Sequence, residues 1–175
     1  MNAPVLSVIV AVQHAQQNLP EIVRALDCAR HPEVEFLFCY TDADPDVPRL
    51  LARENAMRLV HGLPGSLIPH LWRDGILAAR AELVALTTAH CIPDAHWLGR
   101  LMALDWDGLA GIGGAIENHA ESSARDWAVY LLRYVSFAPP QTARRVEEIA
   151  ADNAVYRRAL ILQEADLLRQ GFWEP

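Results

Sequence analysis

Residues 82–97 read ELVALTTAHCIPDAHW and join an apolar run to a polar turn and then to a helix. Residues 83–86 are all apolar, which favours a central strand covered on both faces, as in a largely parallel sheet. Residues 87–91 then break the run, and Pro93 with Asp94 opens a helix whose apolar residues recur at helical spacing. His90 is therefore expected at the carboxyl end of a strand, where open α/β sheets bind ligands.

The composition predicts one soluble domain over residues 1–175. The chain is 52% hydrophobic, yet no apolar run approaches the roughly 18–20 residues that span a bilayer. The amino-terminal stretch MNAPVLSVIVAV lacks the basic region of a signal peptide, and the three cysteines are dispersed. An odd, scattered set of cysteines favours a reducing compartment over a disulfide framework, so we expect a cytoplasmic protein.

The charge balance argues against nucleic acid as a partner. The formal net charge is −7 and the isoelectric point is near 5.4, whereas affinity for nucleic acid comes largely from Lys and Arg on phosphates. An anionic ligand would therefore need a local positive pocket.

Outside the central stretch, apolar runs and polar turns alternate along the chain. Strands are predicted at residues 5–12, 34–40, 58–61 and 109–116, and helices after Asn18 and near residues 47–56, 68–79 and 126–137. This order predicts the α/β class, with a mostly parallel sheet flanked by helices.

Polar residues follow the predicted strands at the points where ligands bind such folds. Asp42 and Asp44 lie in the TDADPD turn, where the alternative role is an Asx-turn and helix cap that needs no ligand. Arg73 suits a phosphate through its forked donors, although a solvent-facing arginine on an amphipathic helix is the commoner outcome. Gly113 and Gly114, inside a predicted strand, indicate a bulge or a close approach of backbone to a ligand.

Two further motifs lie in the carboxyl-terminal part. Residues 153–158 read NAVYRR, and residues 171–174 read GFWE. Together with the 82–97 stretch they resemble family 2 glycosyltransferases of the GT-A type, in which an apolar strand leads to Asp-x-Asp, a proline and a Trp-led helix. Thr88, Ala89 and His90 occupy the Asp-x-Asp positions. The resemblance implies the GT-A three-layer fold, and we expect the chain to lack the family's carboxyl-terminal segment.

The resemblance also implies an activity and a set of site residues. Such enzymes transfer a sugar, here a hexose, from a nucleotide-diphospho-sugar to a hydroxyl acceptor, with inversion. They use a divalent cation, Mn or Mg, at the Asp-x-Asp turn. The matching positions in this chain are Ala11, Gln13, Asp42 and Asp44 for the nucleoside, Arg73 for the diphosphate, Thr88 and His90 at the metal position, Gly113 and Gly114 for the sugar, and Glu174 for the catalytic base.

The chemistry of the turn leaves alternatives for the metal. A neutral His90 imidazole can bind Mn²⁺ or Zn²⁺, with Thr88 acting through a water. A zinc site of His90, Cys91 and His96 is disfavoured, because their spacing fits no structural finger and a fourth ligand is not evident.

Other function classes are excluded or stay open. The AVQHAQQN segment after the first strand has no glycine, which excludes a Rossmann dehydrogenase, and no Walker loop or Gly-x-Ser-x-Gly elbow occurs. The alternative to an enzyme is a non-catalytic, degenerate GT-A domain that binds a nucleotide or a partner protein. A third reading is a fragment of an active protein. Peripheral membrane contact would follow from a lipid-linked acceptor.

Overall fold

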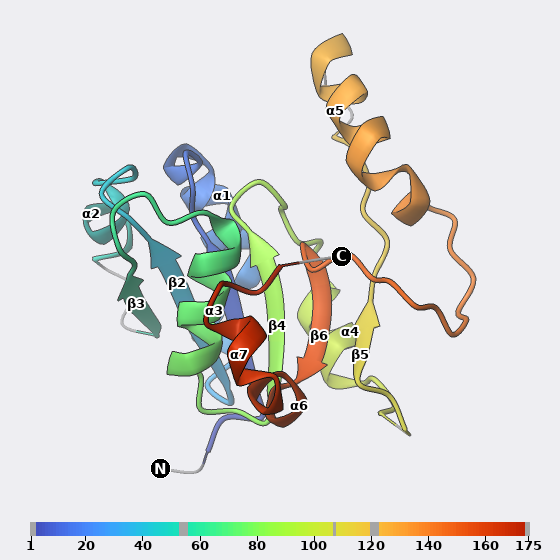
Figure 1. The fold of residues 1–175 in the computed structure, drawn as a ribbon. Helices are drawn as coiled ribbons and strands as arrows, with labels where there is room; N and C mark the ends of the chain where they lie inside the picture. Colours follow the sequence, from blue (N-terminus) through green and yellow to red (C-terminus); the bar gives the residue numbers. More distant parts are fainter. Residues whose placement is uncertain (1–2, 53–55, 107, 120–122, 174–175) are drawn as a thin grey trace.

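A computed structural model describes residues 3–52, 56–106, 108–119 and 123–173 (Figure 1). Its centre is a six-stranded sheet with the strand order β3-β2-β1-β4-β6-β5. The strands are β1 (Leu6–Ala11), β2 (Val34–Tyr40), β3 (Met57–His61), β4 (Leu83–Thr88), β5 (Gly111–Gly113) and β6 (Asn153–Arg157). Four strands, β1 to β4, run parallel, and β6 is antiparallel to both of its neighbours. The predicted α/β class with a mostly parallel sheet is therefore confirmed.

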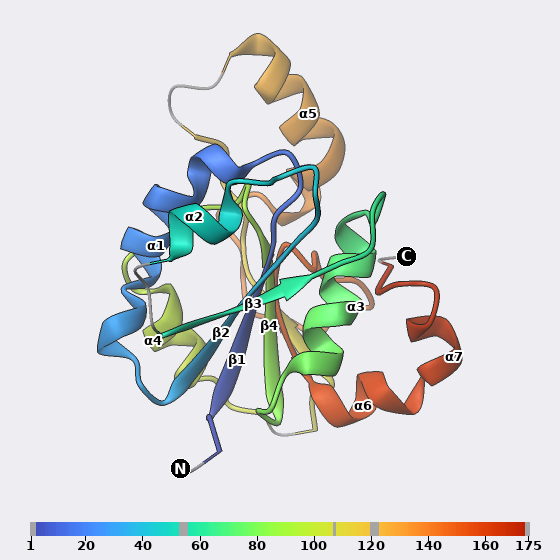
Figure 2. The same ribbon diagram turned by 90° about the vertical axis from the view of Figure 1, so that its left-hand side faces the viewer.

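Helices cover both faces of this sheet (Figure 2). The helices are α1 (Leu19–Leu26), α2 (Val47–Leu51), α3 (Ile68–Ala78), α4 (Trp97–Met102), α5 (Ala124–Tyr134), α6 (Arg158–Gln163) and α7 (Ala165–Leu168). One core joins α1, α2 and α4 to the sheet, and the other joins α3, α6 and α7 to the opposite face. Successive strand residues feed the two cores alternately, because side chains of a strand point to opposite faces: Val8 and Val10 pack on the first, Ile9 and Ala11 on the second.

Two elements differ from the sequence-based expectation. The apolar run was expected to end at Leu86, but β4 continues through Thr87 and Thr88, which are both buried. Residues 153–157, for which no strand was predicted, form β6 between β4 and β5. Both differences come from pairing, because β4 residues 83–87 lie opposite β6 residues 153–157 in register.

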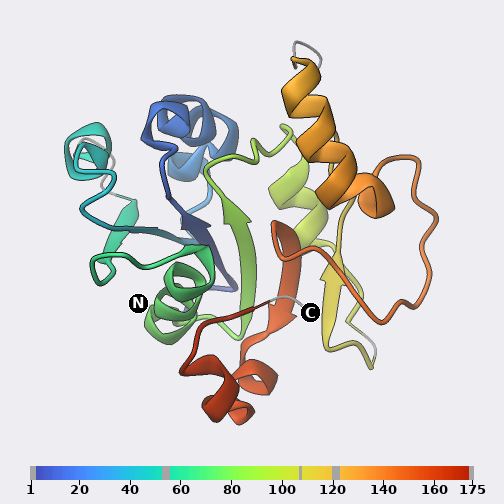
Figure 3. The same cartoon turned by 45° about the horizontal axis from the view of Figure 1, so that its top comes forward.

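The helix α5 projects beyond the end of the sheet, on the side of β6 and β5 (Figures 1 and 3). A Ser123–Asp126 capping box starts it, and a short 3-10 helix, Val135–Phe137, follows it. Its Tyr130 is buried, whereas Trp127 is 45% exposed. Within the described residues, no helix is long and apolar enough to cross a membrane.

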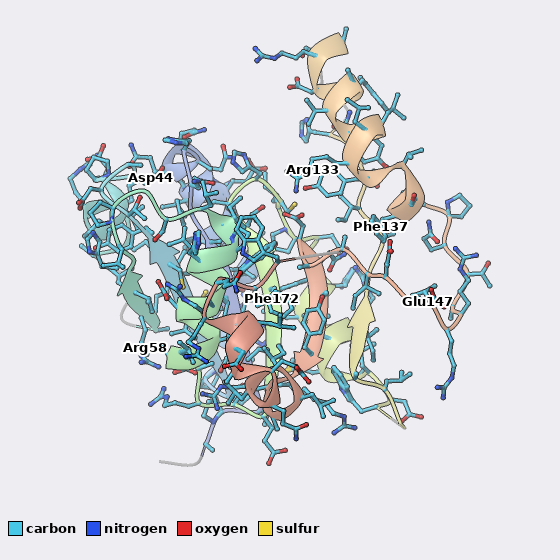
Figure 4. The ribbon with its side chains drawn as sticks, in the orientation of Figure 1. Asp44, Arg58, Arg133, Phe137, Glu147 and Phe172 are labelled. Atoms are coloured by element: carbon cyan, nitrogen blue, oxygen red, sulfur yellow. The ribbon has the colours of Figure 1, made fainter. Side chains whose placement is uncertain are left out.

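A buried carboxylate stabilises the end of the sheet at which the parallel strands begin. Glu35 of β2 accepts hydrogen bonds from the Ser7 hydroxyl at 2.7 Å and from the Arg80 backbone N–H at 2.9 Å. It also pairs with the guanidinium groups of Arg80, at 2.7 Å, and of Arg58, which is labelled in Figure 4. Burial on its own would raise the pKa of Glu35, but these hydrogen bonds together lower it below its ordinary 4.5.

Glu35→Gln should lower the free energy of unfolding by about 2–4 kcal/mol near neutral pH, because charge-assisted hydrogen bonds to a buried group are lost. A carboxyl group whose pKa is lower in the folded than in the unfolded state stabilises the fold at pH values above its unfolded-state pKa. This stabilisation is lost as the pH falls through the folded-state pKa. The difference between the wild type and Glu35→Gln should therefore shrink as the pH falls below 4.5. Urea unfolding at several pH values measures it. Glu82→Gln, at an exposed position, is the control, and an equal loss in both variants would contradict the assignment.

Candidate functional site

Polar loops gather at the edge of the sheet where β1, β2 and β4 end and antiparallel β6 begins (Figure 1). Backbone hydrogen bonds tie the loops to each other: Ala89 N–H donates to the Ala11 carbonyl at 2.9 Å, and Val12 N–H donates to the Cys39 carbonyl at 2.8 Å. The segments after β1, β2 and β4, in which ligand-binding residues were predicted, therefore lie at one edge of the sheet. Such an edge is the usual ligand site of an open α/β sheet.

Asp44 shapes the loop after β1 (Figure 4). Its carboxylate accepts the backbone N–H groups of His14 at 2.7 Å, Ala15 at 3.1 Å and Gln16 at 3.2 Å. The side chain is buried, and the loop it holds includes His14 at φ +54°. Of the two aspartates predicted for the nucleoside, Asp44 is thus directed at the protein's own backbone.

Asp42 lies on the surface of the same edge. Its Oδ1 is 2.9 Å from His61 Nε2, and the two side chains are 71% and 49% exposed. The pair remains accessible to a ligand, and the ring of His61 also meets Tyr40 edge to face. Among the predicted nucleoside residues, Asp42 is therefore the accessible carboxylate.

Gln13 connects three loops. Its side-chain amide donates to the Ser66 carbonyl at 3.3 Å, and its own carbonyl accepts from His90 Nε2 at 3.1 Å. Ala11, the neighbouring predicted position, is buried in β1. The loop after β1, the 62–67 loop and the turn after β4 are consequently linked through one residue.

A carboxylate that the sequence reasoning missed lies beside the end of β4. Thr88 Oγ1 donates to Asp152 Oδ1 at 3.2 Å, and Tyr134 of α5 donates its hydroxyl to Asp152 Oδ2 at 2.9 Å. Burial and the neighbouring Asp152 charge raise the pKa of Tyr134, so its hydroxyl stays protonated. Asp152 is only 3% exposed. Its position just before the NAVYRR motif was the available signal.

The donor atoms at this turn do not fit a divalent cation. His90 is exposed and contributes one imidazole, Thr88 donates its hydroxyl proton to Asp152, and both Asp152 oxygens have protein partners. In the part of the chain that the structure describes, no three His, Cys, Asp or Glu side chains gather closely enough to hold a metal ion. Mn²⁺ and Mg²⁺ prefer several oxygen ligands, and carboxylates above all.

Arg73, which was predicted to bind the diphosphate, forms an ion pair within the protein. Its Nη2 lies 2.7 Å from Asp74 Oδ1, and its Nη1 donates to the Arg169 carbonyl at 3.2 Å. The guanidinium therefore ties α3 to the end of α7. A role on a phosphate would require this side chain to leave those partners.

Gly113 and Gly114 admit neighbouring side chains of the same chain. A Cβ atom on Gly113 would lie 2.7 Å from Ile149, and one on Gly114 would lie 2.5 Å from the Asn153 amide. Asn153 in turn accepts from Trp97 Nε1 and donates to the Ala115 carbonyl, both at 2.8 Å. The atoms that approach these two glycines are the protein's own, and the approach of a ligand stays a prediction. Glu174, the predicted base, lies outside the described residues.

Comparison with known proteins shows the fold. No family model and no curated protein matches the chain, but solved structures do. A mannosyltransferase of Pyrobaculum calidifontis, PcManGT with GDP-Man and Mn²⁺, has a TM-score of 0.63 at 18% identity, over 94% of this chain and 47% of its own. Staphylococcus aureus TarS with UDP-GlcNAc has a TM-score of 0.61 at 14% identity, over 91% and 47%.

A third structure agrees with these two. Glucosyl-3-phosphoglycerate synthase of Mycobacterium tuberculosis, with Mn²⁺, UDP and glucosyl-3-phosphoglycerate, has a TM-score of 0.57 at 14% identity, over 90% of this chain and 58% of its own. The chain thus has the fold of GT-A nucleotide-sugar transferases. It spans about half the length of the solved structures it matches.

The two aspartates of the 41–46 turn should behave differently when they are replaced. Asp44→Ala should lower the free energy of unfolding by about 2–4 kcal/mol, because three backbone N–H groups lose their acceptor. Asp42→Ala should change it by less than about 0.5 kcal/mol, since Asp42 is exposed. Thermal and urea unfolding of the two variants test this. Equal stability of Asp44→Ala and the wild type would show that the loop does not depend on Asp44.

Proposed function

We propose that this chain is a GT-A domain of family 2 that binds a nucleotide-diphospho-sugar and transfers the sugar to a hydroxyl acceptor with inversion. The observation that carries the proposal is the set of polar loops at the carboxyl edge of a β3-β2-β1-β4-β6-β5 sheet. Three structures with this fold are complexes with GDP-Man, UDP-GlcNAc or UDP. These similarities support the donor class.

In this proposal the nucleoside lies over the ends of β1 and β2. Asp42 accepts hydrogen bonds from the ribose or the base, because its carboxylate is exposed beside His61. Gln13 and Ala11 provide the floor of that position, and Asp44 keeps the loop after β1 in place through its three backbone hydrogen bonds. Asp44 is thus a positioning residue in the proposed site.

The diphosphate and sugar are proposed to lie over the turn after β4. Thr88 and His90 line that turn, Gly113 and Gly114 flank the sugar, and Glu174 takes the proton of the acceptor hydroxyl. Arg73 would contribute to the diphosphate only after leaving Asp74. A divalent cation belongs in the test, because two of the similar structures contain Mn²⁺.

A second candidate is a non-catalytic GT-A domain that binds a nucleotide or a partner protein. The observation that favours it is the replacement of both turn acids by Thr88 and His90. The two candidates separate on turnover: both predict nucleotide binding, and only the enzyme releases a nucleoside diphosphate when donor and acceptor are supplied. The cytoplasmic location and any peripheral membrane contact stay predictions.

Calorimetric titration of UDP, GDP and dTDP, with and without Mn²⁺, tests the binding half of the proposal. One nucleotide should bind, and Asp42→Ala should weaken it by about tenfold, the loss expected for one charge-assisted hydrogen bond. Glu82→Ala, at the opposite edge of the sheet, should leave the affinity unchanged. Absence of binding by all three nucleotides under both conditions would contradict the proposed function.

Glu174→Gln tests the catalytic half. The amide cannot accept the acceptor proton, so transfer should fall by about a hundredfold or more, within the range for a lost general base. Nucleotide affinity should stay at the wild-type value. Release of nucleoside diphosphate from a panel of donors measures turnover, and unchanged turnover in this variant would remove Glu174 from the mechanism.

A further inference from the structure

We propose that Arg133 of α5 supplies the positive charge for the donor's diphosphate at the turn after β4, so that nucleotide binding does not require a divalent cation. This inference rests on the proposed function and concerns the same site. It starts from the disagreement between the family's metal turn and the donor atoms that this chain places there.

The polar atoms of the turn already satisfy each other. Asp152 is the buried carboxylate within hydrogen-bonding distance of Thr88, and its two oxygens accept the hydroxyls of Thr88 and Tyr134. A cation would compete with these two donors and would gain the oxygens of only one carboxylate. His90, in the same turn, already donates from Nε2 to the Gln13 carbonyl.

Arg133 brings a permanent positive charge to this place. Its Nη2 lies 3.6 Å from Asp152 Oδ2, and its Cζ lies 5.1 Å from the centre of the Tyr134 ring. Figure 4 shows Arg133 on the side of α5 that faces the strand ends. The Tyr134 hydroxyl anchors the last turn of α5 to Asp152, and therefore holds Arg133 beside the turn.

The guanidinium retains donors for a ligand. The Arg133 side chain is 55% exposed, and an arginine carries five N–H donors in a planar fork. Among the described residues, no hydrogen bond of the Arg133 guanidinium is present apart from its ion pair with Asp152. A fork of this kind matches the geometry of phosphate oxygens.

Three other arginines near the sheet are already engaged. Arg73 binds Asp74 and the Arg169 carbonyl. Arg157 donates to the carbonyls of Leu109 and Trp106, and Arg158 donates to the carbonyls of Ile76 and Leu77. In a chain with a net charge of −7, a diphosphate needs a cation close by, and Arg133 meets this need at the turn.

The proposed role is electrostatic. When the sugar leaves, negative charge grows on the departing diphosphate, and a fixed guanidinium beside it stabilises that charge.

Titration of UDP, GDP and dTDP into the full chain, in EDTA and then in Mn²⁺, tests the proposal. The affinity for the nucleotide that binds should agree within about twofold between the two conditions. Arg133→Ala should lower it by about ten- to a hundredfold, as expected when charged hydrogen bonds are lost. Arg133→Lys keeps the charge and loses the planar fork of donors, so its affinity should lie between those of the wild type and Arg133→Ala. Arg125→Ala, which removes the same charge from the first turn of α5, should match the wild type.

Tyr134→Phe separates charge from position. It removes the anchor of α5 on Asp152 but keeps the ring and the Arg133 charge, so it should cost less affinity than Arg133→Ala. Binding that appears only with Mn²⁺, or an equal loss in Tyr134→Phe and Arg133→Ala, would overturn the inference and leave the proposed function standing. Failure of all three nucleotides to bind in either condition would contradict both.

Discussion

The rest of the structure depends on the burial of β1. All six of its residues, Leu6–Ala11, are buried, and it pairs in parallel with β2 and β4. A strand with both faces apolar must be covered on both sides, which requires the two helical layers. The polar exception, Ser7, is satisfied by Glu35. With both faces closed, a ligand can reach the backbone of the central strands only at their ends.

At those ends, two buried carboxylates each hold one polar segment in place. Asp44 collects three N–H groups of the loop after β1, and Asp152 collects hydroxyls from β4 and α5. Neither carboxylate is free in this arrangement, because a buried charge must have partners. The accessible polar groups of the edge instead include Asp42, His61, His90 and Arg133, and a ligand would meet groups such as these first.

Sequence patterns predicted most strands, because buried parallel strands read as apolar runs: residues 34–40 were correct at both ends. These patterns failed where a polar side chain forms its hydrogen bonds with residues far away in the sequence. Thr87 and Thr88 look like a turn, yet they complete β4, where the Thr88 hydroxyl reaches Asp152, 64 residues away. Asp42 and Asp44 could not be separated, since the partners of Asp44 lie about thirty residues upstream. The exposure of Trp127 could not be predicted from local sequence, because it follows from the projection of α5 away from the sheet (Figure 1).

The identities of residues 88 and 152 are physically coupled. Thr88 Oγ1 lies 3.2 Å from Asp152 Oδ1 and can donate to it, whereas an aspartate at position 88 would have no proton to donate. It would also bring a second carboxylate to a buried carboxylate, and two like charges so close require a cation or a shared proton. A threonine at position 88 removes that requirement. With Asp152 immediately before β6, a threonine at position 88 is therefore the electrostatically consistent choice, and Arg133 lies 3.6 Å from the single carboxylate that remains.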